Sequence, residues 1–189
     1  DLQATTPKSI KIPHPDSVQT AIRIGSKIFN KKHPDYPGLF VLNTILGGYF
    51  GSRLMTNIRE DKGYTYNIFS TLDTMISDGY FYIGTEVGNE FVEPTMTEIY
   101  GEIERLQNEA VEEGELQMVR NYLLGNLLTN LDGPFNVADV IKSLILDDLP
   151  FSEFDQMVHR IKTIESDELR RLAQKYLQKD QLWELIVGA

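Results

Sequence analysis

The sequence of 189 residues contains no cysteine. A chain without thiols has no disulfide framework, no thiolate metal ligand and no cysteine nucleophile. Basic residues are also scarce, because 18 Lys and Arg stand against 28 Asp and Glu and give a formal charge of -10. Since nucleic-acid recognition depends on clustered Lys and Arg, this balance argues against binding to a phosphate backbone.

Long apolar runs and targeting signals are absent as well. No stretch approaches the roughly 18 apolar residues of a membrane-spanning helix. The first residues, "DLQATTPKSIKIPHP", lack the basic and apolar regions of a signal peptide. Because the chain begins with Asp rather than Met, we expect a fragment or a processed chain. We expect no transmembrane segment and favour the bacterial cytoplasm or periplasm as its compartment.

Motifs for metal-dependent or nucleophilic catalysis are missing too. The three histidines, His14, His33 and His159, are far apart, and neither H-E-x-x-H nor H-x-x-E-H occurs. The glycines of "GGYFGS" form neither a G-x-S-x-G nucleophile elbow nor a phosphate-binding loop. We therefore predict no metal site in this chain and assign these glycines a structural role, in which Gly47 and Gly48 end a helix with positive φ.

The apolar residues that are present predict one α+β domain over residues 1–189. A hydrophobic content of 41% is enough for one sizeable core. Strict alternation marks strands, as in "VQTAIRIGSKIF", where Val18, Ile22 and Ile24 share one face. The segments that read as strands are 8–13, 18–29, 64–75, 79–88 and the closing "QLWELIVG".

Helical periodicity fills most of the remaining chain. Apolar residues spaced by three and four predict a helix before Gly47, a short helix from Ser52 to Asp61, and a long one after residue 89. A second stripe runs from Leu116 to Leu131, and Gly133-Pro134 interrupts it. Further helices are predicted over 135–147, 151–162 and 166–178. This pattern favours a sheet with helices packed on it.

Negative charge is concentrated in the first part of this helical region. Residues 86–115 hold ten Glu and a single basic residue, Arg105. Glutamates that alternate with an apolar stripe are typical of a solvated helix face, and a substrate-attracting wall is the alternative. We interpret the run as a solvated face.

Arg59 and Tyr66 stand seven residues apart in "GGYFGSRLMTNIREDKGYTYNIFS". Arg59 is predicted at the end of the short helix and Tyr66 near the start of the next strand, so their side chains can converge beside a sheet edge. A guanidinium and a phenol together can hold backbone carbonyl oxygens of a peptide. From spacing alone, the opposite interpretation is favoured, in which Arg59 pairs with Glu60, Asp61 or the helix end and Tyr66 is an ordinary sheet residue.

The same stretch resembles the segment "LGGGxxSRLxxxxREKxGxxYxxxS" of the pitrilysin/insulinase family of zinc peptidases. The matching half of that family is the C-terminal half, which does not bind zinc. The likeness extends to "HPDSVQTAIRIG", to "DGYFYIGTEV" and to the pair of long helices, and so covers nearly the whole chain. The family is similar to mitochondrial processing peptidase subunits and to core subunits of a respiratory complex.

The resemblance implies a fold and different roles for the two halves of the enzyme. Each half of such an enzyme has a largely antiparallel, six-stranded sheet with helices on one face, and two halves, fused or separate, enclose a chamber. One half, called here the zinc half, binds zinc through H-x-x-E-H. The other supplies an arginine and a tyrosine that hold the substrate backbone, and Arg59 and Tyr66 fall on those positions.

We therefore predict the substrate-binding, active-site-completing half of a zinc metalloendopeptidase, inactive by itself. Tyr66 is the predicted catalytic residue, Arg59 and Tyr66 are the predicted substrate-binding residues, and zinc belongs to the partner half. The predicted partners are that half and a peptide substrate. Two alternatives stay open: a non-catalytic structural or assembly subunit of the same fold, and a free-standing peptide-binding module.

Overall fold

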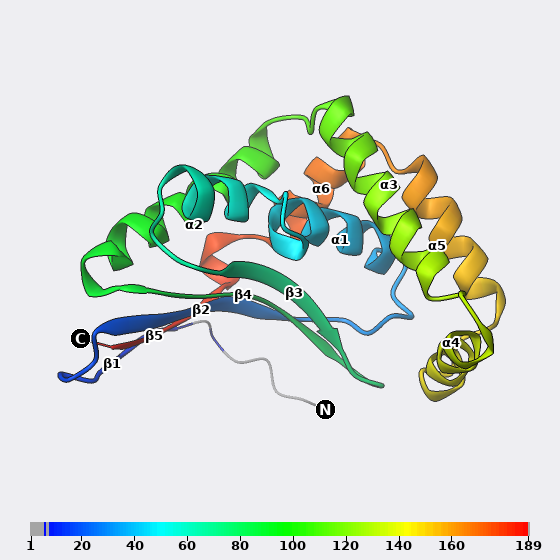
Figure 1. The fold of residues 1–189 in the computed structure, drawn as a ribbon, viewed down its shortest axis with the longest axis horizontal. Coiled ribbons are helices and arrows are strands. Elements are labelled where there is room, and N and C mark those ends of the chain that lie inside the picture. Colours follow the sequence, from blue (N-terminus) through cyan, green and yellow to red (C-terminus); the bar gives the residue numbers. More distant parts are fainter. Residues whose placement is uncertain (1–5, 7, 189) are drawn as a thin grey trace.

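A sheet with helices packed on one of its faces makes up the molecule (Figure 1). The computed structural model describes residues 6 and 8–188. Its strands are β1 (Ser9–Pro13), β2 (Gln19–Ile28), β3 (Ile68–Thr74), β4 (Gly79–Gly88) and β5 (Trp183–Gly188). Their order in the sheet is β1-β5-β2-β4-β3, with β1 parallel to β5 and the other neighbours antiparallel.

The α+β class is confirmed, but the expected six-stranded sheet is wrong for the described residues. They form a mixed sheet of five strands. These five correspond to the five segments that alternation predicts, whereas the sixth strand came from the family resemblance alone. The parallel pair joins the two ends of the chain, with Ser9 opposite Glu184. The alternation of apolar and polar residues does not predict this pairing, because it identifies a strand but neither its direction nor its neighbours in the sheet.

The two faces of the sheet have different surroundings. On β2, Ile22 and Ile24 are fully buried beneath the helices, whereas Arg23 points to the opposite face, which no helix of the described residues covers (Figure 1). Val18, which we expected on the buried face, lies before β2 and is 84% exposed. The uncovered face is referred to below as the open face.

The helices follow the predicted order. Helices α1, α2 and α6 lie over the sheet, α3 and α5 pack beside α1 toward one end of it, and α4 lies beyond that end (Figure 1). Their bounds are α1 (Tyr36–Asn43), α2 (Val92–Asn108), α3 (Glu113–Thr129), α4 (Pro134–Leu146), α5 (Ser152–Thr163) and α6 (Ser166–Tyr176). Two π-helical segments, η1 (Thr44–Gly48) and η2 (Met55–Asp61), follow α1, and the 3-10 turns η3 (Asn89–Phe91) and η4 (Lys179–Gln181) precede α2 and β5.

Gly47 and Gly48 have a different role from the one predicted. They lie within η1, and neither has positive φ. A Cβ on Gly47 would stand 2.5 Å from the backbone nitrogen of Ser70 on β3. Gly47 therefore allows η1 to approach the sheet closely, and no change of chain direction depends on it.

Candidate functional site

The segment between η2 and β3 carries both residues predicted from the sequence. Met55 and Ile58 bury one side of η2 in the core, and Leu54 just before it is buried as well. The helix stops at Gly63, whose φ of +67° is a left-handed conformation that favours glycine. The backbone N–H of Gly63 donates to the carbonyl of Arg59 at 3.1 Å. The chain then turns back toward the sheet.

Arg59 lies near the end of η2 with its side chain half-buried. Its guanidinium carbon lies 4.9 Å from the ring centroid of Phe50, which is itself 60% exposed. Within the described residues, Arg59 forms no ion pair with Glu60, Asp61 or any other acid. Stacking on an aromatic face leaves the guanidinium donors at its rim available to another molecule.

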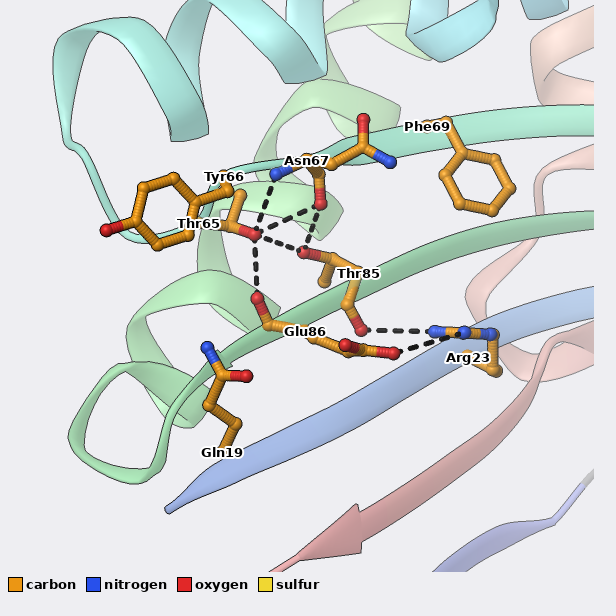
Figure 2. A pocket seen from close by; sticks show the side chains of 8 residues that line it. All are labelled: Gln19, Arg23, Thr65, Tyr66, Asn67, Phe69, Thr85 and Glu86. Carbon is orange, nitrogen blue, oxygen red and sulfur yellow. Dashed lines mark hydrogen bonds and ion pairs between the residues drawn. The ribbon is translucent and has the colours of Figure 1, made fainter.

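Tyr66 is 90% exposed and lies in the loop before β3. The strand predicted from residue 64 begins only at Ile68. Figure 2 shows its ring at one end of a pocket, pointing away from Thr85 and Arg23. Among the described residues, no hydrogen bond involves its hydroxyl, so this group is open to an incoming ligand.

Thr65 fixes the backbone on which Tyr66 stands (Figure 2). Its hydroxyl donates to the carbonyl of Glu86 at 2.7 Å and accepts from the backbone N–H of Asn67 at 3.2 Å. The hydroxyl of Thr85 lies 3.0 Å from the hydroxyl of Thr65 and 2.9 Å from the carbonyl of Asn67. A side chain that bonds two residues onward forms a local turn. Tyr66 is thus an exposed side chain between two anchored neighbours.

The pocket beside Tyr66 opens on the open face of the sheet and has a volume of about 220 Å³. Arg23 forms part of its wall and donates to the carbonyls of Ile22 at 2.9 Å and Thr85 at 3.1 Å. An ion pair at 3.9 Å links Arg23 to Glu86. The lining residues are Gln19, Arg23, Thr65, Tyr66, Asn67, Phe69, Thr85 and Glu86.

Polar contacts from α2 hold η2 in place. Asn57 donates to Glu102 at 2.6 Å and to Glu98 at 3.1 Å, and Lys62 forms an ion pair with Glu98 at 3.1 Å. Hydrogen bonds from Asn57 and Lys62 lower the pKa of Glu98, against the smaller opposing effect of burial. Glu102 is only 3% exposed. The interpretation of the acidic run as a solvated face is therefore wrong for Glu102, and Glu98 is only partly exposed; both connect α2 to the helix that bears Arg59.

The structure places Arg59 and Tyr66 on the two sides of one turn, but no hydrogen bond within the described residues joins them. Arg59 does not line the pocket beside Tyr66. Sequence reasoning missed Thr65, Phe50 and Arg23. Of these three, only Arg23 could have been recognised from the sequence, because it stands on the polar face of the strand predicted over 18–29.

Residues 6 and 8–188 contain no cluster of three or more His, Asp or Glu side chains able to hold a metal ion. They therefore offer no fitting ligand set for zinc. The imidazole Nδ1 of His33 accepts a hydrogen bond from the backbone N–H of Asp35, and its ring stacks on Phe29. None of the helices in this part of the chain is long and apolar enough to cross a membrane.

A family model described as "Peptidase M16 inactive domain" matches residues 1–123. The chain belongs to this family. Among curated relatives of this M16 inactive domain, the "Uncharacterized zinc protease YmxG" of Bacillus subtilis is 22% identical over 173 residues. That alignment covers 90% of the chain and 42% of the relative. An uncharacterized zinc protease of Mycobacterium tuberculosis is 23% identical over 87% of the chain and 37% of its own length.

Solved structures share the fold over almost the entire chain. The peptidase M16 inactive domain from Pseudomonas fluorescens has a TM-score of 0.87 and 25% identity, and the match covers 98% of this chain and 45% of that one. A protease from Helicobacter pylori has a TM-score of 0.89 at 17% identity, covering 97% and 44%. The M16 inactive domain described here thus spans less than half the length of each of these four relatives.

Proposed function

We propose that this chain is the substrate-binding half of a zinc endopeptidase and completes an active site whose zinc half is a separate domain or subunit. Membership in the M16 inactive-domain family and relatives named zinc proteases support the proposal. The observation that carries it is the presentation of Tyr66. An exposed tyrosine between anchored neighbours, with its hydroxyl directed outward, is better suited to binding than to packing.

Tyr66 acts in this proposal as a hydrogen-bond donor to the scissile carbonyl. When water attacks a peptide carbonyl, negative charge develops on its oxygen, and a positioned O–H group stabilises that charge. One such donor is worth about 3–4 kcal/mol in the transition state. The zinc and the water it activates belong to the zinc half, so this chain contributes the donor and its orientation.

Arg59 holds the substrate beside that carbonyl. A guanidinium presents five N–H donors in a planar fork, and backbone carbonyl oxygens accept from it whatever the substrate sequence. The ring of Phe50 beneath Arg59 restricts its rotamers, and the contacts of Asn57 and Lys62 with α2 restrict its helix. Arg59 therefore binds the peptide main chain, and its loss raises KM more than it lowers kcat.

We do not propose that the substrate peptide pairs as an added strand with the middle of β3, although β3 is an edge strand. The amide of Asn43 donates to the carbonyl of Ser70 at 3.3 Å, and the hydroxyl of Ser70 donates to the carbonyl of Asn43 at 3.1 Å. With Gly47 packed against the nitrogen of Ser70, this part of the edge is covered. In this proposal the peptide is instead held here by side chains.

The test is reconstitution with the zinc half from the same source. Peptide hydrolysis is measured for this chain, for the zinc half and for their assembly, and the proposal expects activity only in the assembly. Peptide binding to the isolated chain is measured by calorimetry in parallel. Activity of the zinc half alone, unchanged on adding this chain, contradicts the proposal and favours an assembly role. Tight peptide binding by the isolated chain favours a free-standing binding module.

A further inference from the structure

Helix α4 and its two flanks expose large apolar side chains at one corner of the molecule. None of the residues of α4 is buried. Ile145 is 62% exposed and Phe135 85% exposed. The exposed set, called here the α4 patch, consists of Leu128, Phe135, Ile141, Ile145, Leu146 and Phe151. It lies where α3 ends, α4 runs and α5 begins (Figure 1).

This exposure is unlike that of the neighbouring helices. α2 and α3 bury one apolar side in the core, as amphipathic surface helices do. In α4, by contrast, Val137, Val140 and Leu144 are only half-buried, and the apolar arc continues outward to Ile141 and Ile145. An apolar surface of this kind marks an interface when it is gathered in one place.

The chain holds α4 in a defined position even though its apolar side is open. Lys31 pairs with Asp147 at 2.7 Å and Lys32 with Asp148 at 2.6 Å, just beyond the end of the helix. At its start, the side-chain amide of Asn136 donates to the carbonyl of Asp132 at 2.8 Å. The α4 patch is therefore preformed, and a partner does not have to order it.

Substrate is a poor candidate for covering the α4 patch. The loop that carries Tyr66 precedes β3 at the opposite end of the long axis from α4 (Figure 1). A peptide held at Tyr66 by a few residues does not reach that distance. A body of domain size is needed to contact both ends.

A second copy of this chain is also disfavoured, because the patch has an acidic rim. Asp132, Asp139, Asp148 and Asp155 are exposed around it. Among the described residues, Lys31, Lys32 and Lys142 form ion pairs there with Asp147, Asp148 and Asp139, so acids still outnumber bases at the rim. A symmetric dimer would set this rim against itself, and like charges at an interface oppose association. The four relatives described above, in contrast, contain more than half their length beyond the part that this chain covers.

We propose that the α4 patch is the docking surface for the zinc half, whose complementary face is apolar at its centre and basic at its rim. This inference rests on the proposed function, since it takes the zinc half as the partner. α4 lies beyond the end of the sheet and outside the helical layer (Figure 1), so a body seated on the open face reaches it. Docking there brings the pocket beside Tyr66 under the same partner.

The absence of cysteine makes a direct test available. Ile145→Cys and Ile141→Cys each introduce a single thiol on the patch, and Gln117→Cys places one on an exposed position of α3 outside it. Each variant is labelled with a neutral maleimide, alone and assembled with the zinc half, and this chain's modification is followed by mass spectrometry. We expect labelling at 145 and 141 to slow by about tenfold on assembly, because an interface closes the thiol to the reagent, and labelling at 117 to stay unchanged.

Three results would overturn the docking proposal. The first is an equal labelling rate at residue 145 before and after assembly, and the second is the lack of a stable complex with the zinc half. The third is protection of the isolated chain that increases with its concentration, because this would indicate that a second copy covers the patch. The labelling rate is independent of peptide hydrolysis. Protection of the thiol on assembly, without any peptidase activity, would therefore support the α4 interface and contradict the proposed function.

Discussion

Thr65→Val tests whether the turn that carries Tyr66 positions it for function. The substitution keeps the shape of the side chain and removes the hydroxyl that contacts Glu86, Asn67 and Thr85. Each hydrogen bond contributes about 0.5–1.5 kcal/mol net, and these lie in a partly exposed loop, so a total of about 1–2 kcal/mol is expected. For a chain of this size that lowers Tm by roughly 2–8 °C.

The functional effect of Thr65→Val should exceed its effect on stability. With the turn loosened, the Tyr66 hydroxyl samples positions away from the carbonyl it serves, and a displacement of about 1 Å can cost about 100-fold in rate. Kinetics of the assembled enzyme and thermal unfolding of this chain are measured side by side. Kcat is expected to fall with little change in KM.

Thr65→Ser is the matched control, because it keeps the hydroxyl and should keep most of the turnover. The decisive comparison is between the two variants. If Thr65→Val melts lower but turns over substrate as fast as Thr65→Ser, the hydrogen bonds stabilise the loop without positioning Tyr66, and the reasoning above is refuted.

Two further predictions concern stability. Gly47→Ala should lower the free energy of unfolding by about 1–3 kcal/mol, because the added Cβ clashes with Ser70. The control is Gly101→Ala, whose Cβ meets no atom within 4 Å and which should leave the stability unchanged or raise it. Both are measured by denaturant unfolding, and equal effects would contradict the packing argument. Burial alone would raise the pKa of Asp35, but hydrogen bonds from Lys175, Tyr176 and Arg171 lower it far below its ordinary 3.8. Its stabilisation is therefore complete above about pH 4 and lost as pH falls further, and Asp35→Asn should flatten this acid dependence of unfolding.

The sequence predicts the elements of this fold better than their pairing. Alternation placed five strands and helical periodicity placed the helices to within a few residues, because burial of one face imposes those periods. The parallel pairing of β1 and β5 depends on contacts between the two chain ends, which no local pattern reports.

The site shows the same limit at the level of single residues. Tyr66 was expected on a strand, but the left-handed turn at Gly63 and the side-chain turn of Thr65 delay β3 to Ile68. The burial of Glu102 was missed because its partner Asn57 lies 45 residues away in the sequence. In α4, periodicity predicted the helix and gave no sign that its apolar side lacks an internal partner.

The most direct test of the proposed function is the turnover of the assembled enzyme carrying Tyr66→Phe, with Tyr122→Phe on α3 as the control. The change removes one exposed hydroxyl and no packing, so the stability of this chain should not change. Kcat is predicted to fall by about 100- to 1,000-fold while the control stays near wild type. Wild-type turnover in the assembled Tyr66→Phe enzyme would remove Tyr66 from the mechanism and contradict the account.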